Sequence, residues 1–144
     1  MDRPKISIIT ATYNNRLTIE HTIHSLLSQT YKNIEYIIID GASSDGTLDI
    51  LERYRKHINI FVSEKDNGVY EALNKGLVRA TGDILGFLHA DDSFYSDLTL
   101  ETIAKAFLND NLVATYGDLL YVHPTNPSQI IRYWVSQPFT PDLL

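Results

Sequence analysis

Apolar, β-branched segments alternate along this chain with segments of helical periodicity, and no other feature of the sequence constrains the fold as strongly. Four such apolar runs occupy residues 5–12, 34–40, 60–63 and 84–88. Because these runs are apolar almost throughout, and not only at every second position, they predict strands that are buried on both faces of a parallel sheet. A sheet of this kind requires helices on both of its faces.

Helical periodicity fills the intervals between the runs, where apolar residues recur three and four positions apart. The predicted helices cover about residues 19–31, 47–57, 69–80 and 97–108, and Asp97 is the expected N-cap of the last one. Strand–helix–strand connections of this type are almost always right-handed. The sequence therefore predicts an α/β fold, a three-layer α/β/α sandwich around a mostly parallel sheet.

The pattern weakens towards the C-terminus. Residues 112–123 are predicted to form a further strand, residues 124–127 a turn and residues 129–135 a returning strand. Residues 138–144 show no recognisable period. With 144 residues in all, the chain is expected to form a single domain.

The composition narrows the classes of partner. Twelve Lys and Arg residues against eighteen Asp and Glu residues give a net charge of −6 without any basic run, so nucleic-acid binding is disfavoured. The absence of cysteine excludes disulfides, thiolate zinc sites and cysteine nucleophiles. No run approaches the roughly 18 apolar residues that a membrane span needs. We therefore expect a soluble, cytoplasmic protein.

Polar side chains follow each predicted strand at its carboxyl end. Tyr13 follows the first strand, Asp40 ends the second, residues 64–68 follow the third, and Asp91 and Asp92 follow the fourth. In open α/β sheets, ligands bind at this edge. An acidic edge repels a phosphorylated ligand, so either these carboxylates contact the neutral parts of the ligand or a divalent cation such as Mg²⁺ or Mn²⁺ neutralises them. Without a cation, one of the two adjacent carboxylates would tend to keep its proton.

Each candidate also has a structural interpretation. Asp40 is suited to capping the turn that follows it, and the Asp91–Asp92 pair to a solvated turn. Tyr13 is one of nine tyrosines, most of which must serve the core. His89 precedes the acidic pair, but a histidine at a buried strand end is more often a hydrogen-bonded structural residue than a metal ligand. His89 is therefore left out of the predicted metal ligands.

Four motifs occur in the order that characterises a known family. They are IITATYN at residues 8–14, SLLSQTY at 25–31, IIIDGASSDGT at 37–47, and DNGVYEALNKG with ATGD and LHADD between residues 66 and 92. Together they resemble the family 2 glycosyltransferases of the GT-A fold, which include bacterial polysaccharide and lipopolysaccharide sugar transferases. The third motif departs from the family at one position, because many members carry a second acidic residue where this chain has Gly41.

The resemblance implies a donor site for a nucleotide-diphosphate sugar, by default a UDP-sugar, with Mn²⁺ or Mg²⁺ as cofactor. The residues that it assigns to nucleotide-sugar binding are Thr12, Tyr13, Asp40, Lys75 and Asp91. Tyr13 would stack on the base, and Asp40 would hydrogen-bond the base edge or the ribose. Lys75 is proposed from its position on the third predicted helix, from which it would reach the diphosphate; the alternative is a solvated lysine, as is usual on a helix. Asp91 and Asp92 would hold the ribose and the metal, with Asp92 as the better candidate for the metal.

The resemblance also implies how much of a transferase is present. Members of the family continue through a region that forms the acceptor site and supplies the general base. We therefore expect one family domain that is truncated at its C-terminus, with residues 1–118 as the nucleotide-sugar-binding core and residues 119–144 as the start of the acceptor-side region. The general base is expected outside the chain, and Asp118 is the one candidate for it within the chain.

The implied activity is inverting, metal-dependent transfer of a sugar to a saccharide or lipid-linked acceptor, in cell-surface polysaccharide synthesis. A second hypothesis remains open, a noncatalytic nucleotide-sugar-binding or interaction module that lacks the acceptor half and the base. Two further partners are open as well. One is the inner face of the membrane, because acceptors in this family are often lipid-linked, and the other is a second copy of the chain, because a half-domain exposes apolar surface.

Overall fold

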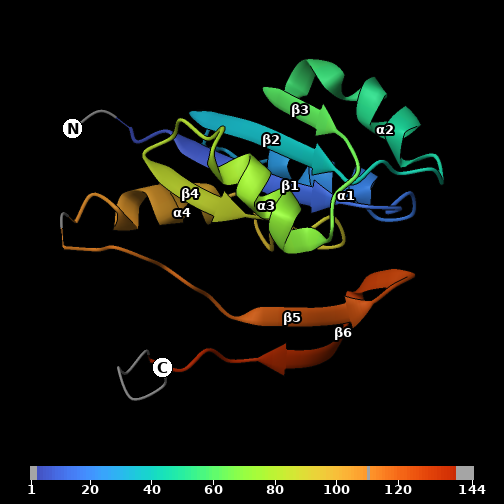
Figure 1. Ribbon diagram of the computed structural model, residues 1–144. Coiled ribbons are helices and arrows are strands. Elements are labelled where there is room, and N and C mark those ends of the chain that lie inside the picture. The colour runs from blue at the N-terminus through green and yellow to red at the C-terminus, as the bar shows by residue number, and fades with distance from the viewer. Residues whose placement is uncertain (1–2, 110, 139–144) are drawn as a thin grey trace. The chain divides into compact units, whose positions relative to one another are not determined.

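Four parallel strands form a sheet in the order β3–β2–β1–β4 (Figure 1). Their bounds are β1 Ile6–Thr12, β2 Ile34–Asp40, β3 Ile60–Ser63 and β4 Ile84–Phe87. The computed structural model describes residues 3–109 and 111–138. It consists of two units, one up to residue 109, which contains this sheet, and one from residue 110 onward.

Helices cover both faces of the sheet. They are α1 Ile19–Leu27, α2 Thr47–Arg53, α3 Val69–Leu77 and α4 Thr99–Ala106, with a short 3₁₀ helix, η1, at Arg55–His57. α1, α2 and α4 share one core cluster with Ile8 and Ile38, whereas α3 packs on Ile9 and Ile37. Successive strand residues therefore enter opposite layers, as the alternation of a strand requires. This arrangement confirms the predicted three-layer sandwich.

The register of the strands brings their carboxyl ends to one edge. Thr12 at the end of β1 pairs with Asp40 at the end of β2, and Asp40 pairs with Ser63 at the end of β3. β4 runs parallel to β1, with Ile9 opposite Phe87. The loops that follow all four strands consequently leave the sheet along the same edge.

The helix predictions for the first unit need correction at their ends. α1 ends at Leu27 and not at residue 31, α3 ends at Leu77 and not at residue 80, and α4 ends at Ala106 and not at residue 108. α2 ends at Arg53, and the 3₁₀ helix η1 replaces the regular turn that was expected up to His57.

Asp97 does not cap α4: the N-cap residue is Leu98, and the Asp97 carboxylate accepts a hydrogen bond from Ser28 Oγ at 2.7 Å. In the first turn of α4, the Leu100 amide donates to Gln29 Oε1 at 3.0 Å. None of the helices in the described residues is long and apolar enough to cross a membrane.

The second unit contains an antiparallel hairpin of β5 (Leu119–His123) and β6 (Asn126–Trp134). The predicted strand over residues 112–123 is wrong in its first part. Its partner β6 ends at Trp134, opposite Leu119, and a strand needs a hydrogen-bonded partner along its length. The hairpin turn is also shorter than predicted, because β6 already begins at Asn126.

A buried carboxylate, that of Glu35, connects β1 and β2 through hydrogen bonds near the amino ends of these strands. Glu35 on β2 is 5% exposed. It accepts hydrogen bonds from Ser7 Oγ at 2.5 Å, from the Thr81 hydroxyl and amide at 2.7 and 2.8 Å, and from Lys5 Nζ at 2.9 Å. Burial alone would raise the pKa of Glu35, but these hydrogen bonds outweigh burial and lower the pKa to about 2.

Glu35→Gln is expected to remove a pH-dependent part of the stability. A folded-state pKa of about 2, below the ordinary 4.5, means that the ionised group stabilises the fold above about pH 4.5, and that this contribution is lost as the pH falls towards 2. We expect the wild type to exceed the variant by about 3 kcal/mol in free energy of unfolding at pH 7, with the gap closing near pH 2. Urea unfolding at several pH values measures this gap.

The matched control is Glu52→Gln, because Glu52 lies exposed on α2. This variant should follow the wild type at every pH. A gap between wild type and Glu35→Gln that stays constant from pH 7 to pH 2 would contradict the assigned role of the Glu35 charge.

Candidate functional site

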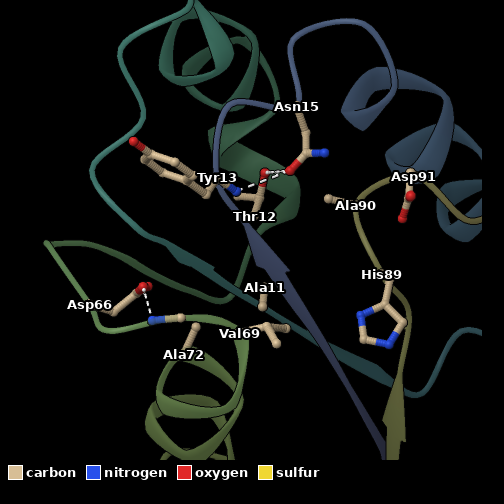
Figure 2. Close-up of a pocket in the computed structure, with 11 residues that line it drawn as sticks. Ala11, Thr12, Tyr13, Asn15, Asp66, Val69, Ala72, His89, Ala90 and Asp91 are labelled. Atoms are coloured by element: carbon tan, nitrogen blue, oxygen red, sulfur yellow. Dashed lines mark hydrogen bonds between the residues drawn. The ribbon is translucent and has the colours of Figure 1, made fainter.

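A cavity of about 310 Å³ opens at the carboxyl edge of the sheet. Its lining comes from the end of β1 and the loop after it, from the loop between β3 and α3 with the start of α3, and from the loop after β4. The lining residues are Ala11, Thr12, Tyr13, Asn15, Asp66, Gly68, Val69, Ala72, His89, Ala90 and Asp91. Figure 2 shows Tyr13 and Asp66 on one side of this cavity and His89 and Asp91 on the other. The site thus lies where the strand order predicts a ligand.

Asn15 holds the loop after β1 in place. Its Oδ1 accepts hydrogen bonds from Thr12 Oγ1 at 3.1 Å and from the Tyr13 amide at 3.0 Å. This loop leaves the Tyr13 side chain in the open, with 62% of the residue exposed. Tyr13 is therefore not a core residue, which removes its structural interpretation. An exposed aromatic ring beside a cavity can stack on a flat ligand.

Asp40 ends β2 in a fully buried position. One carboxylate oxygen accepts a short hydrogen bond from Ser43 Oγ, and the other accepts hydrogen bonds from the Ser43 amide at 3.0 Å and Ser63 Oγ at 2.7 Å. Asp40 does not line the cavity. The turn-capping interpretation therefore describes the hydrogen bonds of Asp40 in this structure. Its contact with a nucleotide stays a prediction.

Ser43 connects this turn to the loop after β1. While donating to Asp40, the Ser43 hydroxyl accepts a hydrogen bond from the Asn14 amide at 2.8 Å, and Asn14 Oδ1 accepts one from the Ser44 amide at 2.9 Å. Both loops contain a residue with positive φ, Asn14 at 54° and Ala42 at 62°. Backbone in this region is costly for alanine and is held by its surroundings. Asp40 thus acts as a positioning residue for the segment that carries Tyr13.

The acidic pair follows β4 in a tight turn. The Asp92 amide donates to the His89 carbonyl at 3.0 Å, and the Thr22 hydroxyl donates to the Asp92 carbonyl at 2.8 Å. Desolvation, and then the charge of Asp91, raise the pKa of Asp92, while His89 opposes this rise. Asp91 lines the cavity but Asp92 does not. The repulsion expected for two adjacent carboxylates is therefore present.

A divalent cation fits the chemistry of this pair. Carboxylate oxygens are hard ligands suited to Mg²⁺ or Mn²⁺, and a cation relieves the repulsion that raises the pKa of Asp92. Within residues 3–109 and 111–138, no three His, Cys, Asp or Glu side chains form a metal-binding group. A cation at this turn would thus need further oxygen ligands from a bound diphosphate or from water.

The interpretations of two further residues, His89 and Lys75, change with the structure. His89 is exposed and lines the cavity, so it is not the buried structural residue that its sequence position indicates. Lys75 on α3 does not line the cavity, because its Nζ lies 3.0 Å from carboxylate oxygens of both Glu64 and Glu71. Hydrogen bonds to these two carboxylates raise the pKa of Lys75. Its charge is therefore already compensated within the protein.

Asp118 belongs to the second unit. Its carboxylate accepts a short hydrogen bond from the Tyr133 hydroxyl, and the Ser136 amide and hydroxyl each donate to it at 2.8 Å. These hydrogen bonds, that of Tyr133 first, lower the pKa of Asp118. A lowered pKa makes a carboxylate a weaker base. The structure thus shows Asp118 as a residue that fastens the hairpin unit, and its role as a general base stays a prediction.

Apart from His89, the polar lining residues that were not predicted as site residues are Asn15 and Asp66. Asp66 follows β3, and its position after a strand was noted in the sequence without a role. Asn15 acts through its hydrogen bonds to the backbone and side chain of its neighbours, a signal that spacing alone does not carry. Both become visible only when the loops are placed around one cavity.

Comparison with known proteins agrees with this geometry. The sequence model of the family "Glycosyl transferase family 2" matches residues 7–140. TuaG of Bacillus subtilis, a teichuronic acid biosynthesis glycosyltransferase by name, is 43% identical over 98 residues, which make up 66% of this chain and 39% of TuaG. A PGL/p-HBAD biosynthesis glycosyltransferase of Mycobacterium tuberculosis is 37% identical over 125 residues, 83% of this chain and 48% of the relative. The chain thus spans less than half the length of these relatives.

Two solved structures resemble the chain in fold and sequence. Staphylococcus aureus TarS in complex with UDP-GlcNAc has a TM-score of 0.65 and 31% identity, over 74% of this chain and 31% of TarS. The mannosyltransferase PcManGT of Pyrobaculum calidifontis, in complex with GDP-Man and Mn²⁺, has a TM-score of 0.66 and 29% identity, over 88% of this chain and 38% of PcManGT. With the family match extending over most of its residues, this chain belongs to glycosyl transferase family 2 and has the GT-A fold.

Proposed function

We propose that this chain forms the donor-binding part of an inverting, metal-dependent glycosyltransferase. The enzyme would move a sugar from a nucleotide-diphosphate sugar to a saccharide or lipid-linked acceptor in cell-surface polysaccharide synthesis. The observation that carries the proposal is the cavity itself, which sets an exposed aromatic ring, Tyr13, opposite an acidic turn with Asp91. This arrangement suits a ligand that has a flat base at one end and a diphosphate at the other.

The names of the relatives support the same chemistry. TarS holds UDP-GlcNAc and PcManGT holds GDP-Man with Mn²⁺ in their solved structures. TuaG is named for the biosynthesis of teichuronic acid, which is a cell-surface polymer. TarS and PcManGT share the fold of this chain at 31% and 29% sequence identity, and TuaG is 43% identical over 98 residues.

Different residues of this chain would bind different parts of the donor. Tyr13 would stack on the base, and Thr12 and Asn15 keep its loop in position. Asp91 and Asp92 would hold Mn²⁺ or Mg²⁺ together with the diphosphate. When bound, the cation would stabilise the negative charge that develops on the departing nucleoside diphosphate. Inversion further requires a base that takes the proton of the acceptor hydroxyl as this oxygen attacks the anomeric carbon.

Calorimetric titration of the purified chain with UDP, GDP and dTDP, with and without Mn²⁺, tests the proposal. We expect one nucleotide to bind with an affinity that Mn²⁺ strengthens and that Asp92→Ala weakens. Failure of the folded chain to bind any of the three would contradict the donor site. Hydrolysis of the matching nucleotide sugar by the chain would argue against a purely noncatalytic binding module, whereas binding without turnover would favour that module.

Tyr13→Ala is expected to weaken binding of this nucleotide roughly 5- to 100-fold, because stacking of a base on an aromatic ring contributes about 1–3 kcal/mol. The side chain is 62% exposed, so its removal should leave the stability of the fold nearly unchanged. Tyr13→Phe is the matched control, since it keeps the ring and removes only the hydroxyl. Equal affinities for wild type and Tyr13→Ala, measured by calorimetry, would show that the base binds elsewhere.

A further inference from the structure

The motif SLLSQTY at residues 25–31 lies at the end of α1 and in the turn that follows this helix. None of these seven residues, all of which the structure describes, lines the cavity. Polar side chains of the motif instead hydrogen-bond the segment that follows the acidic turn, residues 92–97. Thr22, which lies three residues before the motif on α1, binds the start of the same segment. This row of polar groups therefore connects α1 to the backbone that carries Asp92.

Thr22 makes the contact nearest to the acidic pair. The residue is 1% exposed, and its hydroxyl donates to the Asp92 carbonyl at 2.8 Å. The Asp92 amide in turn donates to the His89 carbonyl at 3.0 Å. Both backbone polar groups of Asp92 are thus bound within the protein. Because the rotamers of a side chain depend on the backbone that carries it, these two hydrogen bonds limit the directions that the Asp92 carboxylate can take.

Two further side chains bind the segment at later residues. Ser25 Oγ accepts a hydrogen bond from the Phe94 amide at 3.2 Å. Gln29 is 1% exposed, and its Nε2 donates to the Ser25 carbonyl at 3.1 Å and to the Ser96 carbonyl at 2.8 Å. Its Oε1 accepts from the Leu100 amide at 3.0 Å. These contacts lie further along the chain from the acidic pair, so they hold the segment behind the turn.

The acidic turn needs support of this kind before a cation binds. Two adjacent carboxylates, those of Asp91 and Asp92, repel each other, and an unrestrained turn would let them move apart. Side chains that bind a ligand work best when they are held within about 0.5 Å of the productive geometry. The buried hydroxyl of Thr22 holds the turn by its backbone and leaves both carboxylates available to a ligand.

We propose that Thr22 is a positioning residue that acts through the Asp92 carbonyl and prearranges the acidic turn for a divalent cation. Ser25 and Gln29 support the segment behind the turn, and their influence on the cation decreases with distance from Asp92. The proposal rests on the proposed function of the acidic pair as a metal site. A hydroxyl at position 22 is sufficient for this role, because only the donor to the carbonyl is needed.

Thr22→Val tests the proposal, since it removes the hydroxyl, nearly keeps the size of the side chain and should fold. Calorimetry with UDP, GDP and dTDP, with and without Mn²⁺, identifies the nucleotide that the wild type binds best, and this nucleotide is used for every variant. We expect Thr22→Val to reduce the gain in affinity that Mn²⁺ brings by about tenfold. The metal-free affinity should stay unchanged, because Thr22 does not line the cavity. Thr22→Ser, which keeps the hydroxyl, should retain the wild-type gain.

A graded series separates positioning from a general loss of stability. Ser25→Ala removes the contact with Phe94, whereas Gln29→Met removes three hydrogen bonds of a buried side chain. The loss of stability should be largest in Gln29→Met, because three partners are left unpaired. The loss of the Mn²⁺ gain should be largest in Thr22→Val. Glu35→Gln is the matched control, since it lowers the stability at the amino ends of the strands and should retain the gain.

The outcomes separate this proposal from the proposed function. If Mn²⁺ brings no gain to the wild type, the metal site itself is wrong and the role of Thr22 falls with it. If the wild type shows the gain and Thr22→Val keeps it, or if Thr22→Ser loses it as well, the metal site stands and the role of Thr22 is overturned.

Urea unfolding supplies the remaining comparison. Losses of the Mn²⁺ gain that follow the order of the unfolding free energies would also overturn the role of Thr22, because a merely structural contact predicts that order. Should Gln29→Met fail to fold, Ser25→Ala and Glu35→Gln give the same comparison. The expected result is a loss of gain that is largest in Thr22→Val, smaller in Ser25→Ala and absent in Glu35→Gln.

Discussion

Simultaneous replacement of Asp91 and Asp92 by asparagine is expected to abolish the gain in nucleotide affinity that Mn²⁺ brings. We expect Mn²⁺ to strengthen wild-type binding of the nucleoside diphosphate by about 100-fold, because a cation between two carboxylates and a diphosphate offsets the repulsion between them. The double variant keeps the size of both side chains and loses both charges. Calorimetry of the wild type and the double variant, each with and without Mn²⁺, measures the effect.

The metal-free titration gives this test its second readout. Without Mn²⁺, the two carboxylates repel the diphosphate, so the double variant should then bind the nucleotide at least as well as the wild type. A variant that binds more weakly under both conditions would indicate a distorted cavity instead of a lost metal ligand. The single variants distinguish the two residues: the family resemblance favours Asp92 as the metal ligand, whereas Asp91 alone lines the cavity.

Gly82→Ala is expected to destabilise the first unit by about 3 kcal/mol or more, at the upper end of the costs known for overpacking. A Cβ on Gly82 would lie 2.6 Å from Ser7 Oγ, 2.7 Å from the Ser7 amide nitrogen and 2.8 Å from the Lys5 carbonyl oxygen. Two of these atoms belong to the backbone at the start of β1, which cannot move without disturbing the pairing of Ser7 with Glu35. Urea unfolding, monitored by circular dichroism, measures the loss.

Alanine substitutions at two other glycines serve as comparisons for Gly82→Ala. At Gly117, no atom lies within 4 Å of an added Cβ, so Gly117→Ala should be neutral or slightly stabilising. At Gly76, the new Cβ would lie 2.4 Å from Ile9 Cγ2, but alanine favours the helix by about 1 kcal/mol and offsets part of the strain. We therefore expect Gly76→Ala to cost less than Gly82→Ala. Unfolding free energies of Gly82→Ala and Gly117→Ala that do not differ would refute the steric argument.

Most of the first unit could be predicted from the sequence, because its signals are local. The four apolar runs and the helical stripes between them correspond to β1–β4 and α1–α4. The predictions were wrong where a residue or strand elsewhere in the chain determines the local structure. Residues 112–118 have the composition of a strand, but the pairing between β5 and β6 ends at Leu119. Asp97 has the composition of a helix cap, but its carboxylate accepts a hydrogen bond from Ser28. Neither partner is visible in the pattern of the segment itself.

The sequence predicted the position of the candidate site in the fold, but it predicted the individual residues of the site less well. Strand ends indicated Tyr13 and Asp91, and both line the cavity. Asp40 also stands at a strand end, yet its oxygens are taken up by Ser43 and Ser63. Two of these hydrogen bonds come from Ser43, with a separation of 3 residues, and one comes from Ser63, with a separation of 23 residues. Whether a carboxylate faces a ligand or its own loop therefore depends on the folded conformation of the loops, which the spacing of the residues does not give. The same reason explains why Asp66 was missed.

The Ser43 hydroxyl joins two loops before any ligand arrives, since it accepts from Asn14 and donates to Asp40. The conformational entropy of the segment next to Tyr13 is therefore lost during folding and not on association. A preorganised segment of this kind lets binding proceed with a smaller entropic penalty, so that more of the stacking and electrostatic energy contributes to affinity. The heat signature of nucleotide association should accordingly be that of docking onto a rigid surface, without the large opposing enthalpy and entropy that accompany the ordering of a loop.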